Sequence, residues 1–192
     1  KTVDSKTNNI IFLIYNPCKL FYNKRYFYWL LINLRIYKDK IMKNICIIGA
    51  GRQGTACAYD LIRFLDDINL VFLDVDIDQS KKASARIEKL LGYKAKYQAF
   101  DIFDKNKLID FLNPFDIFLS SVPYHFNVYL TDIAIETKTS MVDLGGHTLN
   151  VRKQLSKSSS ALDAGITIVP DCGMGPGMNV SVALMGVESM DT

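Results

Sequence analysis

Short apolar runs alternate with longer amphipathic stretches through most of the chain. Short runs that end at Gly or polar residues are typical of strands buried on both faces of a parallel sheet. They predict strands at residues 44–48, 69–73, 94–100, 115–121, 140–144 and 166–169. Apolar residues at helical spacing predict helices at residues 53–65, 79–91, 104–112, 126–137 and 151–164. The third strand is the most polar, so we expect it near an edge of the sheet.

Local residue types mark the ends of several predicted helices. Three of them are followed at once or within two residues by Gly92, Pro114 and Gly165. Glycine and proline commonly end a helix. At the start of the third predicted helix, either Asp101 or Asp104 can accept a hydrogen bond from the free backbone N–H groups.

Alternating strands and helices with short connections indicate an α/β fold, in which a parallel sheet is covered on both faces. Right-handed crossovers place the carboxyl ends of all strands at one edge, where ligands of such sheets bind. We predict a Rossmann-type doubly wound parallel sheet of about six strands within residues 42–171. Residues 172–192, with an apolar helix at 180–187, are interpreted as the start of a second domain.

Residues 1–41 differ in composition from the rest of the chain. They contain no Gly, Ala or Glu, and all eleven glycines come later. We interpret this segment as a non-domain extension translated from upstream sequence, with Met42 as the natural start. A targeting or membrane segment is the alternative, but its apolar runs fall short of the roughly 20 residues that a spanning helix needs. A helix lying on a membrane surface stays open.

The charges are divided unevenly between these parts. Residues 1–41 hold eight Lys or Arg and two Asp or Glu, whereas the remainder holds fifteen and eighteen. The predicted domain is therefore slightly acidic, and no basic patch argues for nucleic acid as a partner. The four cysteines include no CxxC pair, so we expect neither a metal site nor a disulfide framework. Isolated thiols fit a reducing cytoplasm.

A G-x-G-x-x-G sequence joins the first predicted strand to the first predicted helix, which is the context in which this motif binds dinucleotides. Gly49 permits a tight turn, Gly51 lets the backbone approach a pyrophosphate, and Gly54 lets the helix pack against the strand. The helix N-terminus offers free N–H groups and a partial positive charge to phosphates. We assign the loop, with Arg52 and Gln53, to cofactor binding; a solvated Arg52 is an equal alternative.

An acid at the end of the second predicted strand completes this fingerprint. Asp74 lies twenty residues after the last glycine of the motif, and its carboxylate can accept hydrogen bonds from the ribose hydroxyls of the cofactor. It would repel a 2′-phosphate, which favours NAD over NADP, although Lys81 and Lys82 can soften that preference. The alternative is that Asp74 or Asp76 only caps the next helix. Asp101 is placed to meet the adenine, or is only a helix cap.

Two loops after later strands carry the candidates for the nicotinamide side. Ser121, Val122, Tyr124 and His125 follow the fourth strand, and His147 follows the fifth. We assign Ser121 and Val122 to cofactor binding. Histidine can accept a proton near neutral pH, and removal of a hydride from an amine needs such an acceptor. We name His125, His147 and Tyr124 as catalytic candidates. The alternative is that each histidine forms hydrogen bonds with the loop backbone and that Tyr124 packs against neighbouring residues.

Asp143 closes the fifth predicted strand just before two glycines. Its carboxylate can orient a substrate ammonium group or hold the N–H groups of the loop, and the structural use is favoured. Three glycines and two prolines in residues 170–179 imply tight turns and a close approach of backbone to a ligand or partner.

Together these residues resemble the saccharopine dehydrogenase-like family, and most closely its lysine 6-dehydrogenase branch. The resemblance rests on GAGRQG (49–54), LDVD (73–76), YHFN (124–127), AIET (134–137), VDLGGH (142–147) and AGITIVPDCGMGPGMN (164–179). It implies an N-terminal Rossmann domain, a separate catalytic and dimerisation domain, and oxidation of an amino acid with NAD or NADP. It places the three motif glycines and Asp74 on the cofactor. Since most of that second domain is missing from the sequence, we interpret the chain as a fragment of a longer product.

We therefore expect an NAD(P)-dependent oxidoreductase that acts on the C–N bond of an amino acid, of lysine 6-dehydrogenase or saccharopine dehydrogenase type. The alternative is an NAD(H)-binding sensor or regulatory module without catalysis. A short-chain dehydrogenase would need G-x-x-x-G-x-G and Tyr-x-x-x-Lys, and neither lies where that fold requires it. We expect a cytoplasmic protein with a small amino-acid substrate, a homodimer in its full-length form, and neither nucleic acid nor membrane as a partner.

Overall fold

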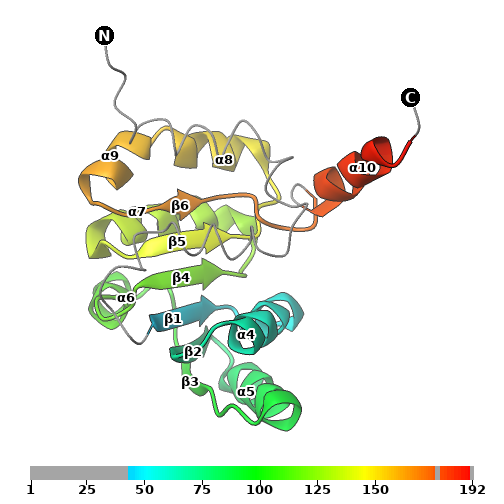
Figure 1. Cartoon of the computed structure of the whole chain (residues 1–192). Coiled ribbons are helices and arrows are strands. Elements are labelled where there is room, and N and C mark those ends of the chain that lie inside the picture. The colour runs from blue at the N-terminus through cyan, green and yellow to red at the C-terminus, as the bar shows by residue number, and fades with distance from the viewer. Residues whose placement is uncertain (1–42, 176–177, 191–192) are drawn as a thin grey trace.

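The computed structural model describes residues 43–175 and 178–190. The expectations for residues 1–41 therefore lie outside the described residues. In the described part, a central sheet is covered by helices on both faces (Figure 1). This arrangement confirms the predicted α/β fold.

The sheet has six parallel strands in the order β3-β2-β1-β4-β5-β6. Their bounds are β1 Lys43–Ile48, β2 Ile68–Asp74, β3 Lys96–Ala99, β4 Ile117–Ser120, β5 Ser140–Asp143 and β6 Ile168–Val169. This is the doubly wound order, in which the chain reverses direction across the sheet between β1 and β4. As predicted, the polar strand β3 lies at an edge, and all four of its residues are exposed. The last strand is shorter than predicted because only two of its residues pair with β5.

Helices connect the strands. Their bounds are α4 Arg52–Phe64, α5 Ile77–Leu91, α6 Lys105–Leu112, α7 Asn127–Thr137, α8 Thr148–Leu155, α9 Ser158–Asp163 and α10 Met178–Glu188, with a short 3-10 helix, η1, at Tyr124–Phe126. Alternate residues of a strand point to opposite faces of the sheet. Ile45 and Ile47 of β1 accordingly pack in the core under α4 and α5, whereas Cys46 and Ile48 pack in the core under α6 and α7.

One predicted helix was wrong, because the segment at residues 151–164 forms two helices, α8 and α9. The break falls at Ser156 and Lys157 in a serine-rich stretch. The hydroxyl of Ser156 donates to the carbonyl of Lys153 at 2.8 Å, and that of Ser158 donates to the carbonyl of Leu155. Serine side chains that bond the nearby backbone compete with the helical ladder, which is why this stretch interrupts the helix.

The structure also decides between the two candidate caps of α6. Asp104 is the N-cap residue, and its carboxylate accepts from the backbone N–H of Lys107 at 3.5 Å. Asp101 instead accepts from the backbone N–H of Phe103 at 2.9 Å, within the turn before the helix. At the carboxyl end of α5, Gly92 adopts a left-handed conformation (φ +71°) and ends the helix as predicted.

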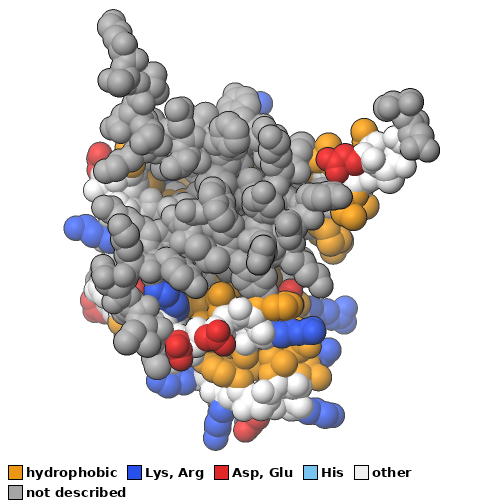
Figure 2. All heavy atoms as spheres, viewed as in Figure 1, with side chains coloured by type: hydrophobic (Ala, Val, Ile, Leu, Met, Phe, Trp, Pro, Cys, Tyr) orange, Lys and Arg blue, Asp and Glu red, His pale blue; other side chains and the backbone are white. Residues whose placement is uncertain are grey.

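Helix α10 projects from the sheet domain, and hydrophobic side chains are exposed along part of its surface (Figures 1 and 2). Met178, Val182, Met185 and Val187 are all more than half exposed. The helix is apolar on every side rather than along one stripe, which is typical of a helix that other protein surrounds.

Candidate functional site

The carboxyl ends of the strands meet at one edge of the sheet, where the loops with the predicted site residues gather (Figure 1). The loop after β1 lies between the ends of β2 and β4, because Gly49 donates its N–H to the carbonyl of Leu73 at 2.7 Å and Ser121 donates its N–H to the carbonyl of Ile48 at 2.8 Å. Residues from three separate parts of the sequence thus form a single surface.

The three motif glycines occupy positions with different requirements. Gly49 has φ +97°, and a Cβ there would lie 2.9 Å from the backbone of Ser121. At Gly54 a Cβ would lie 2.0 Å from the carbonyl oxygen of Gly49, so only glycine allows α4 to pack this closely. A Cβ on Gly51 would meet nothing within 4 Å, and this residue is the N-cap of α4 without a side-chain hydrogen bond. The first turn of α4 therefore presents free N–H groups toward open space.

Asp74 is tied directly to this loop. One carboxylate oxygen accepts from the backbone N–H of Ala50 at 2.8 Å, and the other accepts from the N–H of Asp76 at 3.0 Å. Asp76 is the N-cap of α5 and accepts from the N–H of Asp78 at 2.9 Å. The capping role considered for either acid thus belongs to Asp76, and Asp74 lies against the glycine turn.

Ser121 supports the loop from the other side. Its hydroxyl donates to the carbonyl of Gly49 and lies 3.1 Å from the carbonyl oxygen of Ile48. The next residue, Val122, is half-buried and packs against the core under α6 and α7. Ser121 is thus attached to the glycine turn, and the contact of Ser121 and Val122 with a cofactor stays a prediction.

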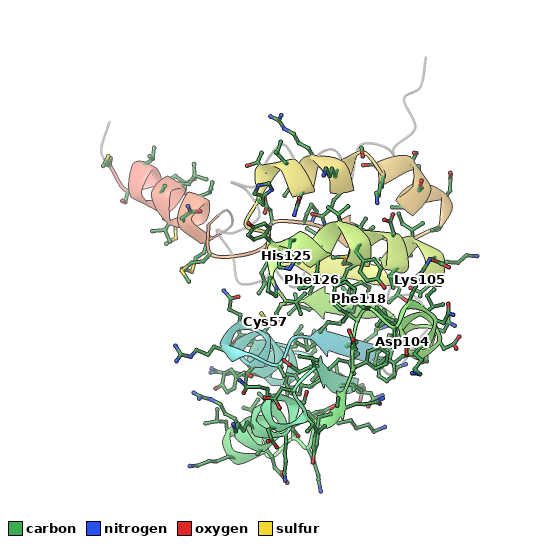
Figure 3. The ribbon with its side chains drawn as sticks, turned by 180° about the vertical axis from the view of Figure 1, so that it is seen from behind. Cys57, Asp104, Lys105, Phe118, His125 and Phe126 are labelled. Atoms are coloured by element: carbon green, nitrogen blue, oxygen red, sulfur yellow. The ribbon has the colours of Figure 1, made fainter. Side chains whose placement is uncertain are left out.

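The three catalytic candidates lie together in the structure. The rings of Tyr124 and His147 stack with their centroids 5.1 Å apart and an interplanar angle of 8°. The ring of His125 stands nearly perpendicular to Tyr124 at 6.0 Å and lies 4.0 Å from the ring of Phe126 (Figure 3). The side-chain amide of Asn150 donates to the carbonyl of Tyr124 at 3.0 Å, which fixes this loop to α8. All three candidate side chains are exposed.

Asp143 holds the loop after β5. It is fully buried, and one carboxylate oxygen accepts from the N–H groups of Gly145 at 2.7 Å and Asp171 at 3.2 Å. The other oxygen accepts from the side-chain amide of Gln154 at 2.7 Å. Burial raises the pKa of Asp143, while these hydrogen bonds act in the opposite direction. Because its oxygens are engaged inside the protein, Asp143 stabilises the loop, as favoured above, rather than binding an ammonium group.

Asp171 completes this arrangement. It has φ +63°, and its carboxylate accepts from the N–H of Gly146 at 3.1 Å. A Cβ on Gly145 would lie 1.9 Å from that carboxylate. Two carboxylates, Asp143 and Asp171, thus hold successive N–H groups of the loop that leads to His147.

Sequence reasoning missed the roles of Asn150, Gln154 and Asp171. Gln154 and Asn150 lie on α8, and no local pattern distinguishes them from other polar helix residues. Asp171 lies in the glycine-rich segment that was expected to form tight turns, so the sequence indicated the importance of this segment. It gave no indication that the Asp171 carboxylate accepts from the N–H of Gly146. Among the residues that the structure describes, Asp101 forms hydrogen bonds with residues 103 and 104, and its proposed contact with adenine stays a prediction.

Within residues 43–175 and 178–190, no group of three or more His, Cys, Asp or Glu side chains is placed to hold a metal ion. In the same ranges, no helix combines the length and apolar character needed to cross a membrane.

Solved structures share the fold of this chain. Saccharopine dehydrogenase (L-Glu forming) from Saccharomyces cerevisiae, in its apo form, matches with a TM-score of 0.62 and 23% identity over 76% of this chain and 31% of its own. Quinate dehydrogenase from Corynebacterium glutamicum, in complex with NAD, matches with a TM-score of 0.53 and 17% identity over 80% of this chain and 52% of its own. The chain thus spans about a third of the length of the yeast enzyme.

The family model described as the saccharopine dehydrogenase NADP-binding domain matches residues 45–169. This range begins in β1 and ends in β6, so it contains the whole six-stranded sheet except for its first two residues. The cofactor class of such a domain is NAD(P), in agreement with the glycine turn and Asp74. Because the match covers more than half of the sequence, the chain belongs to the saccharopine dehydrogenase NADP-binding domain family.

Proposed function

We propose that this chain provides the cofactor domain of an NAD(P)-dependent oxidoreductase that acts on the C–N bond of an amino acid, of lysine 6-dehydrogenase or saccharopine dehydrogenase type. The observation that carries the proposal is the uncapped, unobstructed turn at Gly51 beside the carboxylate of Asp74. Family membership supports the dehydrogenase class. The amino-acid substrate rests on the sequence motifs around residues 124–127 and 142–147.

The donors at this turn fit a dinucleotide. The N–H groups of Arg52 and Gln53 open α4 without a side-chain partner, and backbone donors at a helix N-terminus bind pyrophosphate oxygens. Each carboxylate oxygen of Asp74 accepts one backbone N–H and keeps a second lone pair. Asp74 can therefore accept hydrogen bonds from ribose hydroxyls while it stays attached to the loop.

The aromatic cluster suits the reacting end of the site. When bound, the nicotinamide accepts a hydride from the carbon of the C–N bond. The amine must also lose a proton, and the imidazole nitrogens of His125 and His147 are suitable acceptors at the exposed edge. The stack with Tyr124 restricts the orientation of the His147 ring. We place the start of a second domain at residue 172, so that α10 leads toward the remainder of the substrate pocket.

Cofactor binding is tested by titrating the full chain with NADH and with NADPH and following the fluorescence of the reduced nicotinamide. Gly51→Ala adds a methyl group in the path of the pyrophosphate, and we expect it to weaken binding at least tenfold. Gly186→Ala is the matched control, because a Cβ there also meets nothing within 4 Å and the residue lies in α10. A folded chain that binds neither cofactor would contradict the proposal.

The catalytic part is tested on the longer product to which we assign this domain, with NAD⁺ or NADP⁺ and lysine or saccharopine, by the appearance of the reduced cofactor. Quinate, which contains no C–N bond, is the control substrate. Amine-dependent reduction supports the proposal. Cofactor binding without turnover of either amine would instead favour the regulatory module.

A further inference from the structure

The loops after β5 and β6 are joined to each other at the reacting end of the site. The N–H of Cys172 donates to the carbonyl of Asp143 at 2.8 Å, and the N–H of Asp171 donates to the carboxylate of Asp143 at 3.2 Å. In the opposite direction, the N–H of Gly146 donates to the carboxylate of Asp171 at 3.1 Å. The loop after β6 therefore holds the loop that leads to His147.

Gly146 is held on two sides. Its N–H is bonded to Asp171, and a Cβ added to it would lie 3.6 Å from the ring of Tyr124. That ring is stacked on the imidazole of His147, the next residue in the chain, with an interplanar angle of 8°. The φ of Gly146 is +116°, in the region that favours glycine. The hydrogen bond to Asp171 thus acts one residue away from the stacked imidazole.

The backbone of Asp171 has a conformation that few residues adopt. Its φ is +63°, a value that is uncommon outside glycine, although Asp and Asn tolerate it better than other residues. Its carboxylate occupies the space in which Gly145 would carry a Cβ, since an oxygen lies 1.9 Å from that position. Less favourable backbone conformations of this kind cluster at functional sites. Here the conformation places one carboxylate beside the N–H of Gly146.

We propose that Asp171 is a positioning residue: through Gly146 it holds the imidazole of His147 against Tyr124, in the orientation from which His147 accepts the proton of the substrate amine. This inference rests on the proposed function, because it requires His147 as the proton acceptor. A displacement of a reacting group by about 1 Å can lower a rate about a hundredfold. A bond that fixes the residue next to His147 therefore affects the rate, although Asp171 itself holds only the loop.

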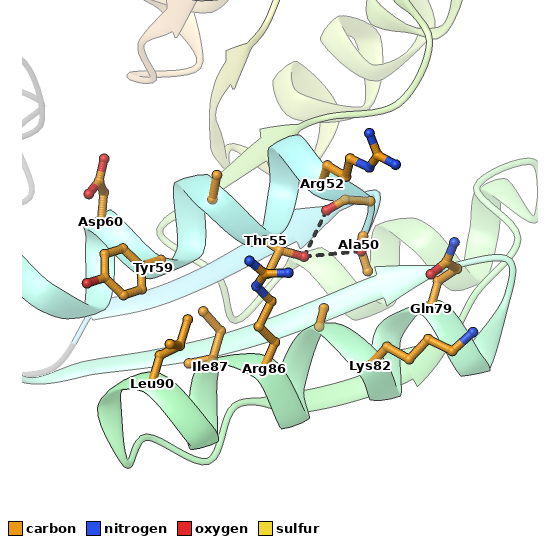
Figure 4. Close-up of a pocket in the computed structure, with 13 residues that line it drawn as sticks. Ala50, Arg52, Thr55, Tyr59, Asp60, Gln79, Lys82, Arg86, Ile87 and Leu90 are labelled. Carbon is orange, nitrogen blue, oxygen red and sulfur yellow. Dashed lines mark hydrogen bonds between the residues drawn. The ribbon is translucent and has the colours of Figure 1, made fainter.

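The cofactor side of the site is built from other parts of the chain. A groove of about 710 Å³ begins at the glycine turn and runs between α4 and α5 (Figure 4). Among the described residues that line it, Ala50 is the first in the sequence and Leu90 is the last. A substitution at Asp171 should therefore leave the affinity for NADH unchanged while it alters the position of the His147 ring.

The test follows the His147 imidazole by NMR in the full chain, which contains only two histidines. In the stack, the ring current of Tyr124 moves the signals of the His147 ring protons upfield, and Tyr124→Leu gives the reference without that ring. Asp171→Gly removes the carboxylate, whereas glycine accepts the positive φ, and we expect this variant to lose most of the upfield shift. Asp171→Asn keeps an acceptor oxygen and tolerates the same backbone, so it should retain the shift.

Asp67→Gly is the matched control, because Asp67 also has a positive φ, of +53°, and lies exposed just before β2. It should leave the His147 signals unchanged, and circular dichroism shows whether each variant is folded. In the longer product, Asp171→Gly should lower kcat at least tenfold with the KM for the cofactor unchanged. Asp171→Asn should recover most of that loss.

Three outcomes would overturn the inference. If the natural chain and Tyr124→Leu give the same His147 shifts, the two rings are not stacked, and no variant of Asp171 is needed to decide. If folded Asp171→Gly keeps the shift, the carboxylate does not position the ring. If Asp171→Asn or Asp67→Gly loses the shift as fully as Asp171→Gly, the hydrogen bond to Gly146 is not the cause. These signals are measured without a cofactor, so their failure is distinct from a failure to bind NADH or NADPH, which contradicts the proposed function.

Discussion

The carboxylate of Asp74 and the backbone N–H of Ala50 form a 2.8 Å hydrogen bond that joins the end of β2 to the turn after β1. The two residues lie 24 positions apart in the sequence, and the parallel pairing of β1 with β2 brings them together. The bond holds the Asp74 carboxylate beside the turn at Gly51, where an added Cβ would meet nothing within 4 Å. A single side chain therefore shapes the glycine turn and faces the region in which we place the cofactor ribose.

Replacing Asp74 tests whether this acid binds the cofactor or only supports the start of α5. We expect Asp74→Ala to weaken NADH binding at least tenfold, since a hydrogen bond to a charged group contributes about 1.5–3 kcal/mol. NADPH binding should fall less, because the variant also removes a repulsive charge. Asp76→Ala is the control: it removes the N-cap of α5, at a cost of about 1 kcal/mol in the free energy of unfolding. Equal losses of NADH affinity in both variants would argue against the ribose contact.

Replacement of Gly54 should lower the stability of the folded chain, whereas replacement of Gly51 should not. Gly54→Ala forces a Cβ to within 2.0 Å of the carbonyl of Gly49, and overpacking of this kind commonly costs about 1–3 kcal/mol or more. Gly51→Ala should leave the unfolding transition almost unchanged, since its Cβ meets open space and the residue has an ordinary φ of −68°. Thermal unfolding of both variants, monitored by circular dichroism, measures the difference. Equal stability of the two variants would show that the α4 packing tolerates a methyl group.

The sheet and the glycine turn could be predicted from the sequence because both depend on local patterns. The runs around Ile47 and Phe72 are apolar on both faces, and the glycines stand at fixed spacing after a strand. The bond from Gln154 to Asp143 could not be predicted in this way, because it joins a helix to a strand across a buried contact.

The break between α8 and α9 shows a different limit of prediction from the sequence. Apolar spacing continues through residues 151–164, so the periodicity predicts one helix. The serine hydroxyls at Ser156 and Ser158 bond nearby carbonyls and change the local backbone without altering that spacing. Helix periodicity reports which side chains are buried, whereas local competition for backbone bonds decides where the helix is interrupted.

Asp143 should make stability depend on pH in a recognisable direction. Burial raises its pKa in the folded state above that of the unfolded chain, which is about 3.9. The folded state then binds more protons than the unfolded state between these two values, so this group's contribution to stability falls as the pH rises through that interval. Unfolding free energies from about pH 4 upward should therefore fall for the natural chain relative to Asp143→Asn. Asp163→Asn, at an exposed position of α9, is the control; a constant difference between the natural chain and Asp143→Asn would contradict the raised pKa.

Gln154 should stabilise the same loop through its bond to Asp143. Gln154→Leu removes the donor to a buried carboxylate oxygen that lies 2.7 Å away, and an unsatisfied buried acceptor costs about 1–3 kcal/mol, or more when it is charged. Because a protonated carboxyl tolerates the loss better and burial raises the pKa of Asp143, the destabilisation should be larger at pH 8 than at about pH 4, near the ordinary pKa of an aspartate. Urea unfolding at the two pH values measures it. Lys153→Leu, at an exposed position of the same helix, serves as the control, and a destabilisation by Gln154→Leu that is the same at both pH values would argue against a charged partner.

Cys172 should resist alkylation although it is not fully buried. Burial raises its pKa to about 12, and the carboxylates of Asp143 and Asp171 act in the same direction. At pH 8 only about one thiol in ten thousand would then be the reactive thiolate. Iodoacetamide labelling, read by peptide mass spectrometry, should modify Cys172 slowly in the folded chain and rapidly in urea. Asp171→Asn removes one of the charges that raise the pKa and should accelerate the reaction, whereas rapid labelling of the unaltered folded chain would show that the thiol ionises far more easily than its surroundings imply.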